Sequence, residues 1–323
     1  MKFFSFVVIF FLCFSCGESE EQVRKNLIIS ANIAMGSGDC DKAIELMTSV
    51  ENPGTDADFI KILALSYACK AKFNVTRFLT SDLQRFDASG TFNGTALFST
   101  SDDVISADDD DFVFLQKAMD TILYSGGLDT DSDPTSAKRS ENFSDDDLNE
   151  LEMVLVYLQL IGMGRFFNYY GESNDEGEKT GCILQYENVA LNAGNFDALM
   201  LAGTLSTGSC TFANYKTSGN GHEDLGEPGD YSIKRLCQGA MLLNNFLHVF
   251  PSLLARISGD DFGNVAAMEA VLNAIISAMN AQKNGTGDNV AGVLSQSRCE
   301  VLNKDEDDYL QVYYLFLMEQ VFR

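Results

Sequence analysis

Residues 144–170, SDDDLNELEMVLVYLQLIGMGRFFNYY, decide the fold of this chain. Ser144 and Asp147 have the spacing of a capping residue and the third residue of a helix, so we expect a helix from here to about Tyr170. Apolar residues recur at helical spacing along one side and also cover most of the remaining surface. Such a helix has to be buried. The stretch predicts a central helix, lined on one side by Leu148, Leu151, Leu155, Leu158 and Gly162.

The rest of the chain continues this helical pattern. Capping residues, apolar spacing and Gly or Pro breaks predict helices over 19–35, 40–50, 56–70, 75–86, 108–125, 182–191, 196–205, 231–250, 258–281 and 307–322. Pro251 is expected to end the helix over 231–250. No segment alternates strongly enough to be a strand. We predict an all-α fold, in which antiparallel helical hairpins over 20–86 continue into a helical body over 108–323, within one domain over 16–323.

Composition excludes some classes of function. Of the 323 residues, 46% are hydrophobic, which is enough to bury a large core. A phosphate backbone would repel a chain with a formal net charge of −25, so we expect no nucleic-acid partner. The same charge argues against electrostatic attachment to anionic lipid. We expect most of these carboxylates to form a solvated surface.

Catalytic motifs are missing from the sequence. The chain contains no nucleophile elbow, no phosphate-binding Gly-rich loop, no dinucleotide fingerprint and no HExxH zinc motif. Its two histidines, His222 and His248, are too few to support a nucleophile relay or a Cys/His zinc site. We therefore expect no enzymatic activity and no cofactor.

Two loops carry weak candidate metal ligands. Asp129, Asp131 and Asp133 have the spacing that opens a calcium loop, but Pro134 and Ser140 stand where that loop requires Gly and Glu. Residues 222–224, His-Glu-Asp, offer an imidazole and two carboxylates without a second histidine nearby. We expect solvated loops at both places and no metal site.

The first 17 residues, MKFFSFVVIFFLCFSCG, predict the cellular address. After Lys2 comes an apolar run that suits a signal peptide and is shorter than the ~20 residues of a membrane-spanning helix. A small residue, Ser15, then precedes Cys16 and Gly17. This arrangement resembles the lipobox of bacterial lipoproteins. The resemblance implies removal of residues 1–15, a lipid anchor on Cys16 and an outer-membrane location that faces the periplasm. An ordinary signal peptide cut nearby is the alternative.

The first two hairpins show a weak internal repeat, with an offset of 33 residues from Leu27 to Ile60. Small residues stand where two helices would approach closely, and large ones stand where a groove would be filled. This pattern resembles a degenerate tetratricopeptide repeat, which implies a protein or peptide partner. The residues that fill the slots are Leu27, Ala31, Ala34, Gly38, Asp39, Ala43, Ile44, Met47 and Pro53, then Ile60, Leu63, Ala64 and Tyr67.

If the hairpins stack as this resemblance implies, the helices over 21–35 and 56–70 line a concave face. Basic residues are scarce in the chain, yet several fall on this face, which could bind an acidic segment or a chain carboxylate. The alternative is that they only balance nearby Glu and Asp residues. The candidate partner-binding residues are Arg24, Lys25, Asn32, Lys61, Lys70 and Lys72.

Six cysteines remain when the signal peptide and Cys16 are set aside. An even number in an exported chain indicates disulfides, whose order the spacing alone leaves open. In stacked repeats Cys40 and Cys69 would stand at neighbouring helix ends, so the resemblance implies that these two pair. The others, in an order left open, are Cys182, Cys210, Cys237 and Cys299.

These features predict a lipid-anchored protein of the bacterial envelope with a binding or assembly role. Its expected partner is an envelope protein or peptide, and its only expected contact with the membrane is the N-terminal lipid. The alternative function is a periplasmic protein that binds a small ligand or a cation and assists a transport system.

Overall fold

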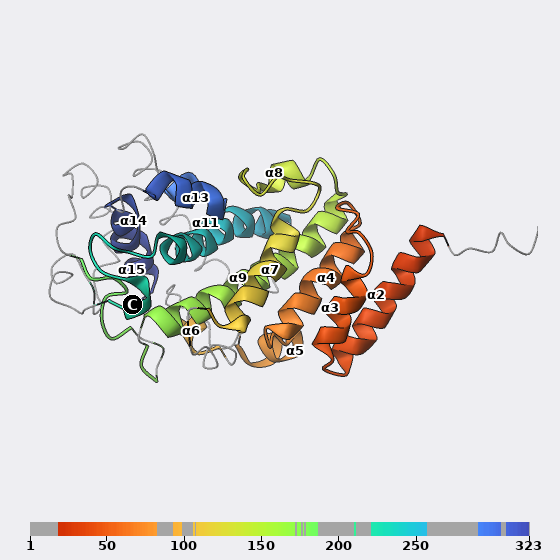
Figure 1. Ribbon diagram of the computed structural model, residues 1–323, viewed down its shortest axis with the longest axis horizontal. Coiled ribbons are helices and arrows are strands. Elements are labelled where there is room, and N and C mark those ends of the chain that lie inside the picture. The colour runs from red at the N-terminus through yellow and green to blue at the C-terminus, as the bar shows by residue number, and fades with distance from the viewer. Residues whose placement is uncertain are drawn as a thin grey trace, which may run out of the picture.

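The computed structural model describes residues 19–82, 93–98, 106, 108–171, 173–175, 177, 179–186, 210, 221–256, 290–304 and 308–322. In these ranges the chain is all-α, as predicted. The same ranges contain no strand, and one isolated β-bridge joins Ser173 to Lys179. Figure 1 shows the helices side by side, from α2 at one end of the molecule to α14 at the other. The helices predicted over 196–205 and 258–281 lie outside the described residues.

The N-terminal end is a stack of three helices, α2 (Glu20–Gly36), α3 (Cys40–Thr48) and α4 (Ala57–Lys70). Side chains that precede each helix accept a hydrogen bond from a backbone N–H in its first turn, which fixes where the helices begin. Gly38 has a positive φ of 80° in the tight turn between α2 and α3. The three helices share a small core of Ala31, Ala34, Ala43, Met47, Phe59, Ile62 and Leu63.

The next helix was predicted over 75–86, and its described part is shorter and less regular. It consists of α5 (Val75–Arg77) and one π-helical segment, η1 (Phe78–Asp82). The short helix α6 (Asn93–Ala96) then packs on the central helix, and α7 (Asp110–Leu123) packs between α4 and the central helix.

The central helix is α9 (Asp145–Tyr170), as residues 144–170 predict. The Ser144 hydroxyl accepts a hydrogen bond from the N–H of Asp147 at 3.2 Å. Helices α4, α6, α7 and α11 all pack against α9. Most of its apolar side chains are buried, and burial of each large one stabilises the fold by roughly 2 kcal/mol.

Arg165 is a buried basic residue of α9 that joins three helices. Its guanidinium donates to the carbonyl of Asp111 at 2.8 Å and to the carbonyl of Ala71, which follows α4. A positive charge at the C-terminal end of a helix satisfies carbonyls that lack helical partners. The buried arginine therefore fixes the end of α4 and the start of α7 against α9.

The helix predicted over 231–250 continues past Pro251, so the expectation that this proline ends it is wrong. The helix is α11 (Ile233–Arg256), with Pro251 inside it. A proline removes one helical hydrogen bond and crowds the preceding turn, but the residues after it can keep helical angles. Val249 and Phe250, next to the proline, are buried, so packing holds this part of the helix in place.

Helix α11 packs closely on α9 because glycines stand at the contact. A Cβ on Gly162 of α9 would lie 2.8 Å from Leu242 Cδ2 of α11. A Cβ on Gly239 of α11 would collide with Phe166 of α9 and with Tyr314. Gly162, the small residue in the apolar stripe of α9, is therefore where α11 approaches α9 closely.

The C-terminal part differs from the prediction in two ways. The 3₁₀ turn η4 (Val290–Gly292) leads to a helix that was not predicted, α13 (Gln296–Asn303), which begins after the N-cap Ser295. The last helix, predicted as one unit over 307–322, is divided into α14 (Asp308–Tyr313), the π-helical η5 (Tyr314–Met318) and α15 (Glu319–Val321).

Three further short segments differ from the prediction. Residues 182–186 are not helical, in contrast to the expected helix over 182–191, because a disulfide and hydrogen bonds from Ile183 and Tyr186 to Glu319 hold them in an irregular path. The short helices α8 (Ser136–Arg139) and η3 (Glu223–Leu225) lie in segments for which no helix was predicted.

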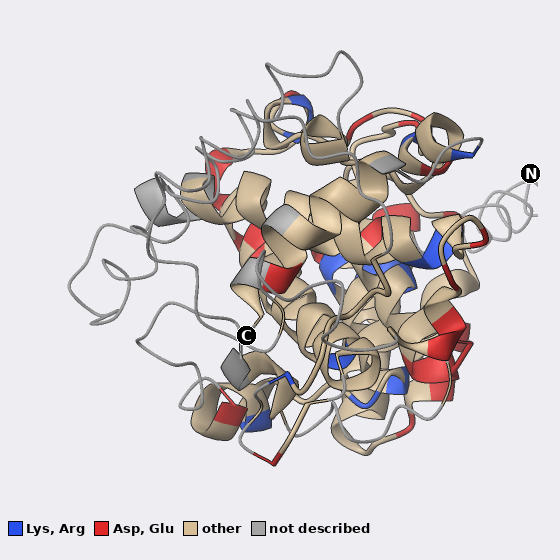
Figure 2. Cartoon of the chain, turned by 90° about the vertical axis from the view of Figure 1, so that its left-hand side faces the viewer, with Lys and Arg blue, Asp and Glu red and all other residues tan. Residues whose placement is uncertain are grey.

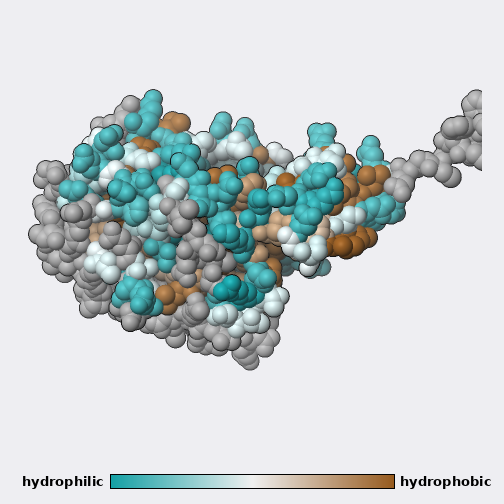
Figure 3. Space-filling view, turned by 60° about the horizontal axis from the view of Figure 1, so that its bottom comes forward, coloured by the Kyte–Doolittle hydropathy of each residue, from teal (hydrophilic) through white to brown (hydrophobic). Residues whose placement is uncertain are grey.

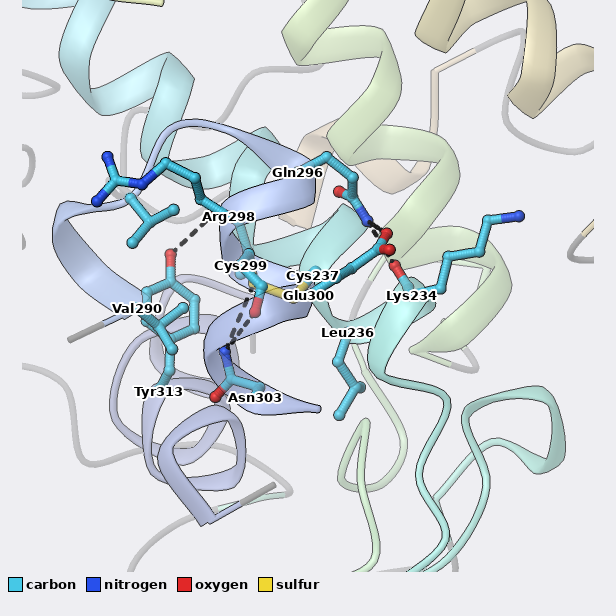
Figure 4. Close-up of a disulfide and its surroundings, with 12 residues drawn as sticks. Lys234, Leu236, Cys237, Val290, Gln296, Arg298, Cys299, Glu300, Asn303 and Tyr313 are labelled. Atoms are coloured by element: carbon cyan, nitrogen blue, oxygen red, sulfur yellow. Dashed lines mark hydrogen bonds between the residues drawn. A yellow bond between two sulfur atoms is a disulfide. The ribbon is translucent and has the colours of Figure 1, made fainter. Parts of the chain in front are cut away.

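Three disulfides join elements that lie far apart in the chain. Cys40 pairs with Cys69, which ties the start of α3 to the end of α4, the pair implied by the repeat resemblance. Cys182 pairs with Cys210, and Cys237 of α11 pairs with Cys299 of α13 (Figure 4). The last two bridges supply the order that the sequence left open.

Candidate functional site

The predicted partner-binding residues of the N-terminal stack lie in ion pairs that connect helices. Lys61 of α4 lies 2.5 Å from Glu150 of α9 and 2.9 Å from Asp58. Lys70 of α4 lies 2.8 Å from Asp41 of α3. Burial alone would lower the pKa of Lys61, but hydrogen bonds to Glu150 and Asp58 outweigh it and raise that pKa. In Figure 2, which views the molecule from the opposite end, Lys and Arg residues are interspersed with Asp and Glu residues along the chain.

The other members of this set have similar partners. Arg24 lies 3.5 Å from Asp56, which caps α4, and Lys72 lies 3.0 Å from Asp111. Lys25 pairs with Glu21 one helical turn away, at 2.6 Å, and the Asn32 amide donates to the Ile28 carbonyl at 3.1 Å. These contacts support the alternative given above, in which the basic side chains balance nearby carboxylates and hold the stack together.

The Asp129, Asp131 and Asp133 loop is used as a structural connection. Asp133 Oδ1 accepts hydrogen bonds from the N–H groups of Leu294 and Ser295 at 2.8 and 3.2 Å, and its other oxygen pairs with Arg298. Asp129 Oδ1 accepts from the N–H of Asp131. The third aspartate therefore holds the start of α13, and within the described ranges the three carboxylates do not gather around one point.

His222 and Asp224 support the aromatic end of α9. The imidazole of His222 packs on Tyr169 and Tyr170, with ring centroids 4.7 and 5.3 Å away, and its Nδ1 accepts from the N–H of Asp224. The Tyr169 hydroxyl donates to Asp224 at 2.5 Å. The loop is therefore tied to α9 by these contacts.

A group of potential ligands lies around Glu319. The sulfurs of Cys182 and Cys210 and a carboxylate oxygen of Glu319 lie within 4.8 Å of one another and are buried. The two sulfurs form a disulfide, and Glu319 receives hydrogen bonds from Lys179, Ile183 and Tyr186. These atoms are already bonded within the chain, so the group is structural.

A cleft of about 250 Å³ lies between α7, α11 and α13. Phe112 and Val113 supply apolar surface, and Val113 is 40% exposed. Charged and amide side chains form the rest of the lining. They are Asp108, Gln116, Lys117, Asp120, Lys234, Arg235, Gln238, Gln296 and Glu300.

The polar side chains of the cleft are held in place by one another. Arg235 pairs with Asp108 and donates to Gln238 at 3.3 Å. Gln116 donates to Asp120 at 2.7 Å. Burial raises the pKa of the Asp120 carboxyl to about 6, against the lowering effect of this hydrogen bond. A perturbed carboxyl in a cleft with several charges is a feature of binding sites.

No motif in the sequence marks any of these cleft residues as a binding residue. Apart from Asp108, which lies just before α7, they come from three helices, and each looks like an ordinary residue of a helix surface when taken alone. One weak sequence signal for the cleft is the pair Lys234 and Arg235. These two cations lie in the first turn of a helix, where the macrodipole disfavours positive charge.

No protein-family model, curated protein or solved structure matches this chain. Among the helices of the described ranges, none has the length and apolar character needed to cross a membrane. Cys16 and the apolar run before it lie outside the described residues.

Proposed function

We propose that this chain is a lipid-anchored protein of the bacterial cell envelope that binds a protein partner through its N-terminal helical stack and carries out no catalysis. The resemblance of residues 1–17 to a lipoprotein signal supports the anchor on Cys16 and an outer-membrane location facing the periplasm. Three disulfides in the structure suit an oxidising compartment such as the periplasm.

The observation that carries the binding role is the outer face of α2. Ile29 and Ile33 stand one turn apart on it, 58% and 69% exposed. Apolar (brown) surface gathers at the same end of the molecule in Figure 3. The terminal helix of a soluble helical stack normally has a polar outer face. Two large exposed aliphatic side chains there fit a surface that another helix covers.

The charge of this face also suits a protein partner. The residues exposed beside the two isoleucines are mostly uncharged, namely Gln22, Asn26, Ser30 and Asn32, and Lys25 is paired with Glu21. The face is therefore close to neutral in a chain of net charge −25. A partner helix could pack here without the repulsion that it would meet over the acidic surface.

Site-specific photo-cross-linking in intact cells tests this binding role. A photoreactive residue at Ile33 should form an adduct with one defined envelope protein, and Ile33→Asp should abolish its co-purification. Val301 on α13 is 66% exposed and serves as the matched control, since Val301→Asp places the same charge at an equally exposed apolar residue. Equal adducts from both positions would reject a binding face on α2.

A companion variant tests the basic residues first considered for binding. Lys61→Glu/Lys70→Glu breaks the ion pairs with Glu150 and Asp41 and should lower stability without a specific loss of the partner. Selective loss of the partner, with unchanged stability, would move the binding site to that face.

Metabolic labelling with a fatty-acid analogue tests the anchor. Wild type should be labelled and recovered with the outer membrane, and Cys16→Ser should be neither. Equal labelling of the two would reject lipid attachment at Cys16.

A small-ligand function is the second candidate, and the cleft between α7, α11 and α13 is the observation that favours it. Calcium binding at the Asp129, Asp131 and Asp133 loop has less support, because Asp133 already accepts hydrogen bonds from backbone N–H groups and pairs with Arg298.

A further inference from the structure

The cleft between α7, α11 and α13 has two walls with the same charge pattern. Helix α7 places Lys117 and Asp120 one turn apart on one wall. The opposite wall has Lys234, from the first turn of α11, and Glu300, from α13. Each wall therefore presents one cation and one carboxylate to the same space.

On the opposite wall, α11 and α13 are held together next to the cleft. The Gln296 amide donates to the Lys234 carbonyl at 2.9 Å and to the Glu300 carboxylate at 2.6 Å (Figure 4). The disulfide between α11 and α13 is close to this contact in the sequence, because Cys237 follows Lys234 by three residues and Cys299 lies between Gln296 and Glu300. The wall is therefore built before any ligand arrives, which lowers the entropy cost of binding.

On the α7 wall, both charged groups are also positioned by neighbours. The Lys117 ammonium lies 5.0 Å from the centroid of the Phe114 ring, a cation–π contact. Asp120 accepts from Gln116, and within the described part of the chain no other side chain is seen to donate to it. A cationic group in the cleft would give this half-buried carboxylate the counter-charge that it lacks.

The remaining charged residues of the cleft balance each other. Arg235 pairs with Asp108. With this pair included, the lining has equal numbers of basic and acidic side chains. This local neutrality contrasts with the formal net charge of −25 for the whole chain. A simple cation would be attracted to many other places on such a surface. A group with a negative end would be repelled by such a surface, so a cleft lined by Lys117, Lys234 and Arg235 suits it better.

The size and the apolar surface limit the ligand further. A volume of about 250 Å³ lies below the ~300–1,000 Å³ of pockets for drug-sized molecules. Phe112 and Val113 offer a small apolar surface for a short aliphatic group.

We propose that this cleft binds a small zwitterion of the size of one amino acid. Its ammonium group lies near Asp120 and Glu300, its carboxylate lies near Lys117 and Lys234, and its apolar group contacts Phe112 and Val113. The proposal is independent of the partner-binding face on α2.

Isothermal titration with three probes that share a branched aliphatic tail tests the charge requirement. L-Leucine has both charges, 4-methylpentanoate has only the carboxylate, and 3-methylbutylamine has only the ammonium. L-Leucine should bind at least about tenfold more tightly than either single-charge probe. Equal binding of one single-charge probe, or no binding of L-leucine at millimolar concentration, would overturn the proposal.

Variants then place the ligand in this cleft. Lys234→Gln and Glu300→Gln should each weaken L-leucine binding, and Val113→Phe should block it by filling the space. Val113 is exposed, so the larger side chain is compatible with folding, which circular dichroism checks. The matched controls are Lys42→Gln and Glu141→Gln, exposed residues outside the cleft that should bind as wild type does. Unchanged affinity in all three cleft variants would overturn the assignment.

Discussion

The ammonium group of Lys179 and the carboxylate of Glu319 form an ion pair without exposed surface, with 2.6 Å between Nζ and Oε2. The second carboxylate oxygen accepts from the N–H of Ile183 at 2.7 Å and from the Tyr186 hydroxyl at 3.0 Å. The carboxylate is therefore saturated with donors. It attaches residues 179–186, which have no regular structure, to the C-terminal helix.

Breaking this pair should be costly. In Glu319→Gln the Lys179 charge stays buried without its counter-ion, so we expect a loss of about 3–5 kcal/mol in the free energy of unfolding by urea. Adding Lys179→Met removes the stranded charge, while the amide oxygen introduced by Glu319→Gln still accepts from the N–H of Ile183. The double variant should therefore recover most of the loss. A double variant no more stable than the single one would contradict this account.

The Cys40–Cys69 bridge should stabilise the N-terminal stack in particular. Replacing both residues with serine releases a loop of 29 residues, which in the chain-entropy model costs about 3.6 kcal/mol. Hydrogen exchange should become faster in α2 and α3, while α11 keeps its protection as the internal control. Peptide mapping without reduction should find this bridge and the two other pairs, and a free thiol at Cys40 or Cys69 would contradict it.

The role of Asp133 can be separated from calcium binding. Asp133→Ala leaves the N–H groups of Leu294 and Ser295 without their acceptor, so we expect a loss of about 1–3 kcal/mol with or without calcium. Asp131→Ala is the control and should have little effect. Calcium or a chelator should leave the melting temperature of the wild type unchanged. A calcium-dependent rise that Asp131→Ala abolishes would restore the metal-binding hypothesis.

Local signals in the sequence were enough to predict the main helices. Ser19, Asp56 and Ser144 cap α2, α4 and α9 where the capping residues indicate, because a cap needs only its own helix. The burial of α9 at the centre of the fold was also predictable, because apolar residues around most of its surface are visible in its own sequence. Local sequence patterns did not predict helix bounds that depend on tertiary contacts. Buried contacts around Pro251 allow α11 to continue, and Asp133 holds the start of the polar helix α13.

The candidate cleft could not be predicted in this way. Asp120 and Glu300 are 180 residues apart in sequence. They reach the same lining only because α7 and α11 both pack on α9, and α13 packs on α11. The exposed pair Ile29 and Ile33 also looks like an ordinary apolar pair of a helix until α3 and α4 are seen to pack on the other side of α2.

Asp120 should make stability depend on pH. Its pKa in the folded protein is raised from 3.8 to about 6 by burial, so between these values the unfolded chain has released a proton that the folded chain keeps. This group therefore favours the folded state most below about pH 4, and its contribution is lost as the pH rises through about 6.

The difference between wild type and Asp120→Asn measures this contribution. Asn cannot ionise, so Asp120→Asn should gain stability relative to wild type as the pH is raised from about 4 to 7, in urea denaturation at each pH. Glu141→Gln removes one exposed carboxylate and is the control for the change in net charge. A difference that is constant across this range would show that the Asp120 carboxyl titrates as it does in the unfolded chain.

Gly239 should be required for the close approach of α9 and α11. In helices Ala is usually more favourable than Gly by about 1 kcal/mol, so a stabilising effect would be expected from propensity alone. A Cβ at residue 239, however, would collide with the Tyr314 hydroxyl and the Phe166 ring, both of which are fully buried. Overpacking of this kind costs about 1–3 kcal/mol, so Gly239→Ala should lower the free energy of unfolding.

The matched control for Gly239→Ala is Gly36→Ala, in the last turn of α2. A Cβ on Gly36 would meet nothing within 4 Å, so this variant should be neutral or slightly more stable than wild type.

Tyr314→Phe tests whether the Tyr314 hydroxyl is the group that a Cβ on Gly239 meets. It removes the hydroxyl that donates to the Leu236 carbonyl at 2.9 Å and should be destabilising on its own. Because it also makes room for the new methyl group, the double variant should lose less stability than the sum of the two single losses. Strict additivity, or a Gly239→Ala variant as stable as wild type, would show that α9 and α11 can move apart without cost.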